Sequence, residues 1–311
     1  MSADTQRPRV MADEELPNVL RERLSADVEL VPWNPHPGAA ERDVSGIFTF
    51  GHPIVDDTML AGLPALKVVS NHGVGVDHID VEAAERRGIL VGNTPGVLDG
   101  AVADLAFALL LAAARRLPES AAVARNPATV AFDQMQLHGQ EVHGSTLGIV
   151  GLGRIGAGIA RRARGFDMQV LYHNRRPQAD VASAIGAEYV SLEALLRSAD
   201  FVILCVPLSE STRRLIGAKQ LGWMKPSAVL INVARGPVVD TDALVTALNA
   251  GQLWAAALDV TDPEPLPRNH PLLSMPNVLV TSHIGSASLQ TRQRMADMAV
   301  ENLLRGLELR K

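Results

Sequence analysis

A glycine motif that follows a short apolar run constrains the fold of this chain more than any other feature. After residues 147–150 (LGIV), Gly151, Gly153 and Gly156 stand in the spacing G-x-G-x-x-G, and a helix-like segment follows at 157–164. The first glycine permits a tight turn, the second lets the backbone approach a pyrophosphate, and the third lets helix and strand pack closely. The N–H groups of the helix N-terminus attract phosphate. This pattern predicts a dinucleotide site rather than the alternative, a tight turn without a ligand.

The strand after this motif ends in basic side chains. Residues 168–172 are strand-like, and Asn174, Arg175 and Arg176 follow about 20 residues after the motif, where an NAD enzyme usually places an acidic residue on the ribose. A carboxylate there would repel a 2′-phosphate, whereas guanidiniums offer it charge-assisted donors. We therefore expect NADP(H) to be the preferred cofactor, with NAD(H) as the second choice. A solvated basic loop is the alternative interpretation.

Composition limits the classes of protein that this chain can belong to. Its 311 residues, 47% of them apolar, exceed what one hydrophobic core usually holds, so two domains are expected. The net charge of −5, with acids and bases interspersed, favours neither a nucleic-acid nor a membrane partner. The longest apolar run, 105–114, is too short to span a bilayer, and the first residues lack an apolar signal segment.

The chain has one cysteine, Cys205. A single cysteine excludes an intrachain disulfide framework and fits a reducing, cytoplasmic location. It lies in the strand-like run 201–206 (FVILCV), which favours a role as a small core residue.

Strand-like and helix-like segments alternate along the chain, which is typical of parallel sheets flanked by helices. We expect short strands at 46–50, 67–70 and 89–91 with a helix at 79–87 before the glycine motif, then a connecting apolar helix at 102–116. After the motif we expect strands at 169–172, 201–206, 228–233, 255–259 and 277–281.

The final helix, expected at 289–307, lies beyond the last strand of the second sheet and is expected to return to the first domain. The predicted fold is therefore α/β, with two Rossmann-like, doubly wound parallel-sheet domains. The substrate domain is discontinuous, comprising residues 1–97 and 285–311 in a flavodoxin-like arrangement. Residues 98–284 form the NAD(P)-binding domain.

Three polar residues each follow a strand of the second sheet, where open α/β sheets place their ligand crevice. His283 can donate a proton to a carbonyl oxygen during hydride transfer. Glu264, as a buried carboxylate partner, would hold the imidazolium, and Arg235 could bind a substrate carboxylate. Taken singly, Arg235 could form an ion pair at a helix end, Glu264 could be a rim charge, and His283 could be a hydrogen-bonded loop residue.

Five runs of sequence together resemble the D-2-hydroxyacid dehydrogenases. They are NHGVGVDHID (71–80), GIVGLGRIG (148–156), INVARG (231–236), LDVTDPEP (258–265) and SHIGSA (282–287). The resemblance extends from about Ser45 to the C-terminus, and the segments 263–273 and 283–287 are most similar to the glyoxylate/hydroxypyruvate reductases. It implies that Arg235 binds substrate, that Glu264 orients His283, and that His283 is the acid/base.

The resemblance also implies further site residues. The backbone amides of Val74 and Gly75 would receive the substrate carboxylate, with Arg235, His283 and Ser286 as the other substrate contacts. The implied cofactor contacts are Gly151, Leu152, Gly153, Arg154, Ile155, Gly156, Asn174, Arg175, Arg176, Val206, Pro207, Thr212, Val233, Ala234, Asp259 and Gly285. No metal site is expected.

The chain departs from the family pattern in places. Phe132 stands where many of these reductases have a tryptophan that shapes the substrate pocket, and Asp104 replaces a usual glutamate. The sequence up to about Ala40 matches only loosely, and we interpret residues 32–37 as a loop. We expect Phe132, Val74–Gly75 and the loop 50–52 to wall a small pocket.

The resulting hypothesis is a homodimeric, NADPH-preferring reductase of small 2-oxoacids such as glyoxylate and hydroxypyruvate. One alternative is an NAD-linked D-2-hydroxyacid dehydrogenase for a larger substrate such as 2-ketogluconate. The other is a non-catalytic, dinucleotide-sensing corepressor, which would not need Arg235, Glu264 and His283. A formate-type dehydrogenase is disfavoured, because those enzymes place glutamine where Glu264 stands.

Overall fold

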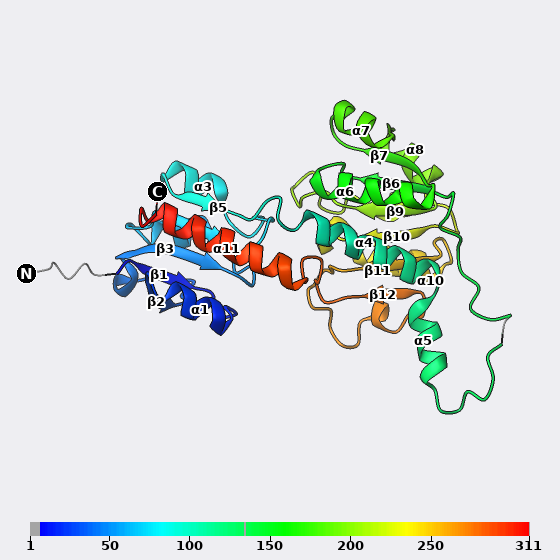
Figure 1. Cartoon of the computed structure of the whole chain (residues 1–311), viewed down its shortest axis with the longest axis horizontal. Helices are drawn as coiled ribbons and strands as arrows, with labels where there is room; N and C mark the ends of the chain where they lie inside the picture. The colour runs from blue at the N-terminus through cyan, green and yellow to red at the C-terminus, as the bar shows by residue number, and fades with distance from the viewer. Residues whose placement is uncertain (1–6, 134, 311) are drawn as a thin grey trace, which may run out of the picture. The chain divides into compact units, whose positions relative to one another are not determined.

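The computed structural model describes residues 7–133 and 135–310, and the chain divides into two compact units. The first unit combines residues 1–98 with residues 288–311, and the second comprises residues 99–287. Each unit is a parallel β-sheet with helices on both faces (Figure 1). The fold class predicted from the sequence, α/β with parallel sheets, is confirmed.

The first unit has five strands in the order β2-β1-β3-β4-β5, all parallel, which is the flavodoxin-like order. Helices α1 and α11 cover one face of this sheet, and α2 and α3 cover the other. The elements are β1 (Arg9–Ala12), α1 (Asn18–Leu24), β2 (Glu29–Pro32), the 3₁₀ helix η1 (Ala39–Glu41), β3 (Val44–Thr49), α2 (Asp57–Ala61), β4 (Val68–Asn71), α3 (Val81–Arg86), β5 (Leu90–Gly92) and α11 (Leu289–Gly306).

The second unit has seven parallel strands in the order β12-β11-β10-β9-β6-β7-β8. Its helices and strands are α4 (Asp99–Ala114), α5 (Leu117–Arg125), β6 (Thr146–Val150), α6 (Arg154–Ala163), η2 (Arg164–Phe166), β7 (Gln169–His173), α7 (Ala179–Ile185), β8 (Ala187–Tyr189), α8 (Leu192–Ser198), β9 (Phe201–Leu204), α9 (Ala218–Leu221), β10 (Val229–Asn232), η3 (Gly236–Val238), α10 (Thr241–Asn249), β11 (Ala255–Leu258), η4 (Pro271–Leu273) and β12 (Val278–Val280).

Two hydrophobic cores hold the second unit together. Helices α4 and α6 pack on one face of the sheet, and α8, α9 and α10 pack on the other. Strand β6 lies between β7 and β9, so its last residue, Val150, pairs with His173 on one side and Leu204 on the other. The strand order reverses at β6, and the crevice outside the carboxyl ends of such strands is where doubly wound folds bind ligands.

Most predicted elements occur within one to three residues of their expected bounds, and α11 packs against β3, β4 and β5 of the first unit, as expected for the returning helix. Strands β1, β2 and β8 were not predicted. Strand β2 ends at Pro32, the first residue of the loop predicted at 32–37. Because β2 is an edge strand of the sheet, it tolerates proline. None of the described helices has the length and apolar content needed to cross a membrane.

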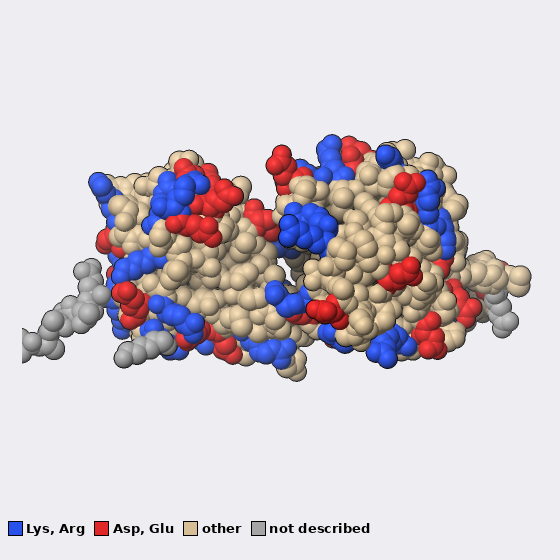
Figure 2. Space-filling model, turned by 90° about the horizontal axis from the view of Figure 1, so that it is seen from above, with Lys and Arg blue, Asp and Glu red and all other residues tan. Residues whose placement is uncertain are grey.

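Charged side chains of both signs are interspersed on the surface of each unit on the face drawn in Figure 2. Residues 126–133 and 135–145, between α5 and β6, form neither helix nor strand. This long segment carries Phe132, whose relative exposure in the described chain is 72%.

Candidate functional site

The three candidate catalytic residues follow adjacent strands of the second unit. Arg235 lies after β10, Glu264 after β11 and His283 after β12, and these strands are neighbours in the parallel sheet. All three residues are therefore at the same edge, the one formed by the carboxyl ends of the strands. The sequence prediction that they share one edge agrees with this arrangement.

His283 and Glu264 are in direct contact. The Nδ1 atom of His283 lies 2.7 Å from Oε1 of Glu264, and the backbone N–H of Thr261 donates to Oε2 of the same carboxylate at 3.2 Å. Both carboxylate oxygens are therefore held. Because Glu264 engages Nδ1, proton exchange between His283 and a substrate would use the other ring nitrogen, Nε2.

Electrostatics keep Glu264 ionised. Partial burial raises its pKa, but the hydrogen bond and charge of His283, the Thr261 amide and the charge of Arg235 outweigh burial, so the pKa of Glu264 is below its ordinary value. The sequence suggested a buried carboxylate, whereas the Glu264 side chain is 40% exposed in the structure. Its loop, between Pro263 and Pro265, lies beyond the sheet edge rather than under a helix.

Asp259 fixes the segment that carries His283. This aspartate is 2% exposed; its Oδ1 accepts from the Thr281 hydroxyl at 2.6 Å and from the Ile284 amide at 2.8 Å, and its Oδ2 accepts from the Gly285 amide at 2.8 Å. The backbone carbonyl of Asp259 also accepts from the His283 amide at 2.9 Å. These bonds hold His283 at φ 53°, a left-handed conformation that costs a non-glycine residue about 1 kcal/mol or more.

This positioning role of Asp259 was missed from the sequence, which suggested only a cofactor contact for Asp259 and Gly285. The Asp259 carboxylate forms its hydrogen bonds with the segment that follows β12. The one sequence signal available was an aspartate directly after an apolar strand.

The segment that carries Arg235 is fixed by Asn232 and Gly236. Asn232 is buried, accepts from the Ala234 amide and donates to the Arg235 carbonyl, both at 3.0 Å. A Cβ on Gly236 would lie 1.9 Å from the Thr261 carbonyl oxygen, so only glycine lets the Arg235 segment approach the Glu264 segment this closely. The two segments are thereby positioned against each other.

The glycine motif has the form that a pyrophosphate requires. Gly151 has φ 106°, and a Cβ there would lie 2.9 Å from the backbone of Cys205, whereas a Cβ on Gly153 would meet nothing within 4 Å. Helix α6 starts at Arg154 with Gly153 as its N-cap and no capping side chain. Its first N–H groups and the open space at Gly153 fit a dinucleotide phosphate. The predicted contacts 151–156 therefore come together in one turn and the first three residues of α6.

The predicted nucleotide-selecting residues lie beside this loop. The Asn174 side chain accepts from the Leu152 amide at 2.6 Å, so Asn174 braces the glycine loop. Arg175 and Arg176 are exposed and make no ion pair with any residue that the structure describes. They follow β7 at its carboxyl end, where a ribose 2′-substituent would lie in a Rossmann site.

The remaining predicted cofactor contacts follow β9 and β10. Thr212 donates to the Pro207 carbonyl at 2.7 Å and accepts from the Ser209 amide at 2.8 Å, so it holds the loop after β9 closed. Val206, Val233 and Ala234 occupy the same strand ends. Cys205 is half-buried and packs against the core of the second unit, and burial raises the pKa of its thiol to about 12, which leaves it unreactive.

The predicted substrate contacts lie in both units. Val74 and Gly75 form a half-buried turn after β4 of the first unit, and Ser286 is half-buried after β12 of the second. In the described residues no three His, Cys, Asp or Glu side chains are grouped to bind a metal ion.

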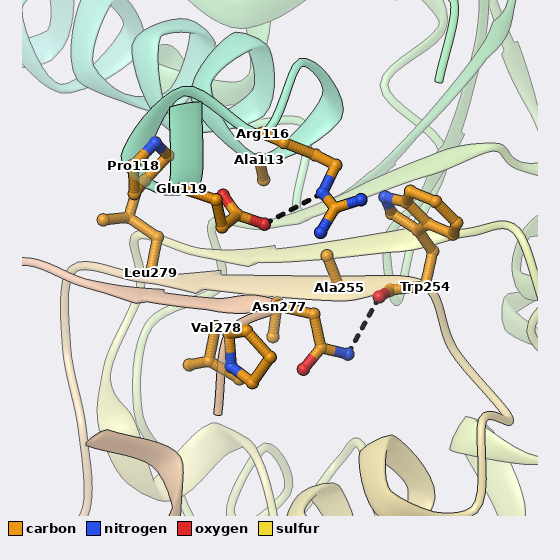
Figure 3. A pocket seen from close by; sticks show the side chains of 11 residues that line it. Ala113, Arg116, Pro118, Glu119, Trp254, Ala255, Asn277, Val278 and Leu279 are labelled. Carbon is orange, nitrogen blue, oxygen red and sulfur yellow. Dashed lines mark hydrogen bonds and ion pairs between the residues drawn. The ribbon is translucent and has the colours of Figure 1, made fainter. Parts of the chain in front are cut away.

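A cavity of about 240 Å³ lies elsewhere on the second unit (Figure 3). Its lining includes Ala255 and Val278, which begin β11 and β12, so it is at the amino ends of the strands. Arg116 and Glu119, paired at 3.1 Å, and Trp254 give it its polar and aromatic walls. Because the candidate catalytic residues follow the carboxyl ends of the strands, this cavity is not the catalytic site.

Comparison with known proteins agrees with the geometry. Residues 107–285 match the profile of the D-isomer specific 2-hydroxyacid dehydrogenase NAD binding domain. A glyoxylate reductase from Korarchaeum cryptofilum is 43% identical over 306 residues, 96% of this chain and 92% of the relative. The chain belongs to the D-isomer specific 2-hydroxyacid dehydrogenase family.

Solved structures of similar proteins extend over almost the whole chain. The TT0316 protein of Thermus thermophilus is 45% identical with a TM-score of 0.87, and 97% of this chain aligns with 98% of that one. An NADPH-dependent glyoxylate/hydroxypyruvate reductase from Sinorhizobium meliloti, solved with NADP and malonate, is 39% identical with a TM-score of 0.88, covering 96% of this chain and 93% of that one. This member of the D-isomer specific 2-hydroxyacid dehydrogenase family is an NAD(P)-dependent oxidoreductase.

Proposed function

We propose that the protein reduces small 2-oxoacids, glyoxylate and hydroxypyruvate, to the corresponding 2-hydroxy acids, and that it prefers NADPH to NADH. The observation that carries the proposal is the His283–Glu264 pair at 2.7 Å, with Arg235 close enough for its charge to act on the same carboxylate. The relatives named glyoxylate reductase support the choice of substrate.

The chemistry assigns one task to each side chain. A reduced nicotinamide dinucleotide, held by the glycine turn after β6 and the start of α6, would supply a hydride to the carbonyl carbon of the 2-oxoacid. His283 donates a proton from Nε2 to the carbonyl oxygen, and the ionised Glu264 balances the charge of the imidazolium and orients its ring. Arg235 binds the substrate carboxylate and polarises the adjacent carbonyl group. Together the hydride and the proton reduce the aldehyde of glyoxylate or the ketone of hydroxypyruvate to an alcohol.

The preference for NADPH rests on Arg175 and Arg176. Both guanidiniums are exposed beside the glycine loop, and Asn174, the residue nearest the usual carboxylate position, carries no charge. A 2′-phosphate would therefore meet two cations and no anion from these three residues. The Sinorhizobium meliloti reductase, described as NADPH-dependent, supports this part of the proposal.

We further propose a cytoplasmic homodimer that has no nucleic-acid or membrane partner. Four large apolar side chains between α5 and β6 or at the start of α5 are exposed in the single chain: Leu117 at 53%, Val130 at 100%, Phe132 at 72% and Met135 at 78%. A second copy of the chain would remove them from water. The single, half-buried cysteine suits a reducing compartment.

Steady-state kinetics with both cofactors and a range of 2-oxoacids test the proposal. With NADPH, kcat/KM for glyoxylate or hydroxypyruvate is expected to exceed that for pyruvate, 2-ketogluconate and 3-phosphohydroxypyruvate. An additional methylene changes binding by only about 1–3 kcal/mol, so some turnover of larger substrates is expected. The proposal fails if 2-ketogluconate or the phosphorylated acid is preferred tenfold or more over both small substrates.

A further inference from the structure

We propose that Asn71 and Asn93 are positioning residues for the substrate carboxylate, because they turn the backbone amides of Val74 and Gly75 outward. The inference rests on the proposed function and concerns the first unit alone. Neither asparagine was among the site residues expected from the sequence.

In the turn after β4, the carbonyl groups of Gly73, Val74 and Gly75 are all hydrogen-bonded. The Asn71 side-chain amide donates to the carbonyls of Gly73 at 3.1 Å and Gly75 at 2.8 Å, and the Asn93 amide donates to the Val74 carbonyl at 2.9 Å. The Thr94 backbone amide adds a second bond to Gly73 at 2.9 Å. Three consecutive carbonyls are therefore tied to neighbouring segments of the first unit.

The backbone N–H groups of the same turn, those of Val74 and Gly75, are not tied to neighbouring segments as the carbonyls are. In a trans peptide the C=O and the following N–H point in opposite directions, and the peptide bonds of this turn are trans. Fixing the carbonyls of Gly73 and Val74 thus directs the N–H groups of Val74 and Gly75 away from the asparagines. Neither N–H donates a hydrogen bond to any residue that the structure describes.

Asn71 is itself rigidly held. It is 0% exposed, and its Oδ1 accepts from the hydroxyl of Thr49, also 0% exposed, at 2.9 Å. The backbone at Asn93 is tied to α11, because the Asn302 side chain donates to the Asn93 carbonyl at 2.9 Å. The turn is therefore preorganised by β3, β4 and α11 before any ligand arrives, and two adjacent outward N–H groups form an anion site that a carboxylate fits.

The test replaces the donors without adding charge. In Asn71→Leu the carbonyls of Gly73 and Gly75 lose their side-chain donor, and in Asn93→Ala the Val74 carbonyl does. We expect each variant to raise KM for glyoxylate and hydroxypyruvate at least tenfold, to change kcat less than threefold, and to leave the Kd for NADPH unchanged. The Kd for oxalate, a non-reducible dianion, measured by calorimetry on the NADPH complex, should rise at least tenfold as well.

Asn277→Ala is the matched control, because the Asn277 amide donates to the Trp254 carbonyl at 3.0 Å in the other unit. It should change none of these values. The inference is overturned if oxalate Kd stays within twofold of the wild-type value in Asn93→Ala, or if kcat and NADPH affinity fall in parallel with substrate affinity. A wild-type enzyme that binds oxalate but reduces neither acid would contradict the proposed function alone, since oxalate binding still decides the role of the asparagines.

Discussion

At the scale of single residues, the pair formed by His283 and Glu264 determines which proton moves. The carboxylate contacts Nδ1 and the Thr261 amide, so its charge is fixed about one hydrogen-bond length from the imidazole. Partial burial raises the pKa of Glu264, but the hydrogen bond and the charge of His283 outweigh burial, so the carboxylate stays ionised beside the imidazole.

Glu264→Gln should therefore lower kcat/KM for glyoxylate with NADPH by about tenfold or more at pH 7. The glutamine keeps a hydrogen-bonding side chain but has no charge to balance the imidazolium that donates the proton. Steady-state kinetics of the variant and the wild type, together with the Kd for NADPH of both proteins, measure the effect. Activity within threefold of the wild type would mean that the ring needs the hydrogen bond at this position but not the negative charge.

Arg175 and Arg176 carry a second prediction at this scale. Replacing both with glutamine should weaken NADPH binding by about 2–4 kcal/mol, while NADH binding barely changes, because only the 2′-phosphate needs their charge. Fluorescence titration of both cofactors measures the two Kd values. Equal losses for NADPH and NADH would refute the assignment.

At the scale of elements, the loops after β10, β11 and β12 act as one assembly. The Asp259 side chain is hydrogen-bonded to the segment 281–285, and the Asn232 side chain to the segment 234–235. Gly236 lets the segments that contain Arg235 and Thr261 come into contact. The strand ends alone would not place Arg235, Glu264 and His283 with the required accuracy. These backbone contacts supply that accuracy.

Gly236→Ala tests this assembly. The new Cβ would lie 1.9 Å from the Thr261 carbonyl oxygen, so the two segments must separate, at a cost of about 1–3 kcal/mol in unfolding free energy. We expect a lower Tm and a fall in kcat/KM of at least tenfold, while NADPH affinity changes little. Gly100→Ala in α4, where a Cβ meets nothing within 4 Å, should leave both activity and Tm intact or raise the Tm. Full activity in Gly236→Ala would show that the close approach is not required.

Some of the helices and strands could be predicted from the sequence, whereas others could not. Strands such as β6 and β9 are continuous apolar runs buried on both faces, and the glycine spacing marks the turn after β6. These strands and this turn could therefore be predicted from the sequence. Strand β1 is four residues long and begins with Arg9, and β8 has three residues, too few for a periodic pattern. The candidate catalytic residues Arg235, Glu264 and His283 could be predicted because each is a polar residue that follows a strand. Asn71, Asn93 and Asp259 position the site through hydrogen bonds to backbone groups, and no local sequence pattern encodes these.

At the scale of the whole molecule, length and composition predicted more than one core, and each unit has one on either face of its sheet. A buried histidine links the stability of the first unit to pH. His72 is 4% exposed and packs against the Phe50 ring at 4.8 Å; burial, then the charges of Arg292 and His52, lower its pKa to about 4.

Stability should therefore decline as the pH falls from 6.5 toward 4. Between these pH values His72 becomes protonated in the unfolded chain but stays neutral in the folded chain. The free energy of unfolding therefore falls, by about 3 kcal/mol once the pH is below both pKa values. Urea unfolding of the wild type and His72→Phe between pH 5 and 6.5, above the carboxylate range, measures the effect. The variant should show a shallower dependence on pH; identical slopes would assign the dependence to other groups.

The account depends most on His283 acting as the proton donor of an NADPH-dependent reductase. The direct measurement is kcat/KM for glyoxylate and hydroxypyruvate with NADPH at pH 7, for the wild type and His283→Asn side by side, together with the Kd for NADPH of both proteins. The account predicts turnover of both acids by the wild type, a loss of about 10²–10⁴-fold in the variant, and unchanged NADPH binding. A variant that retains activity within tenfold of the wild type would contradict it.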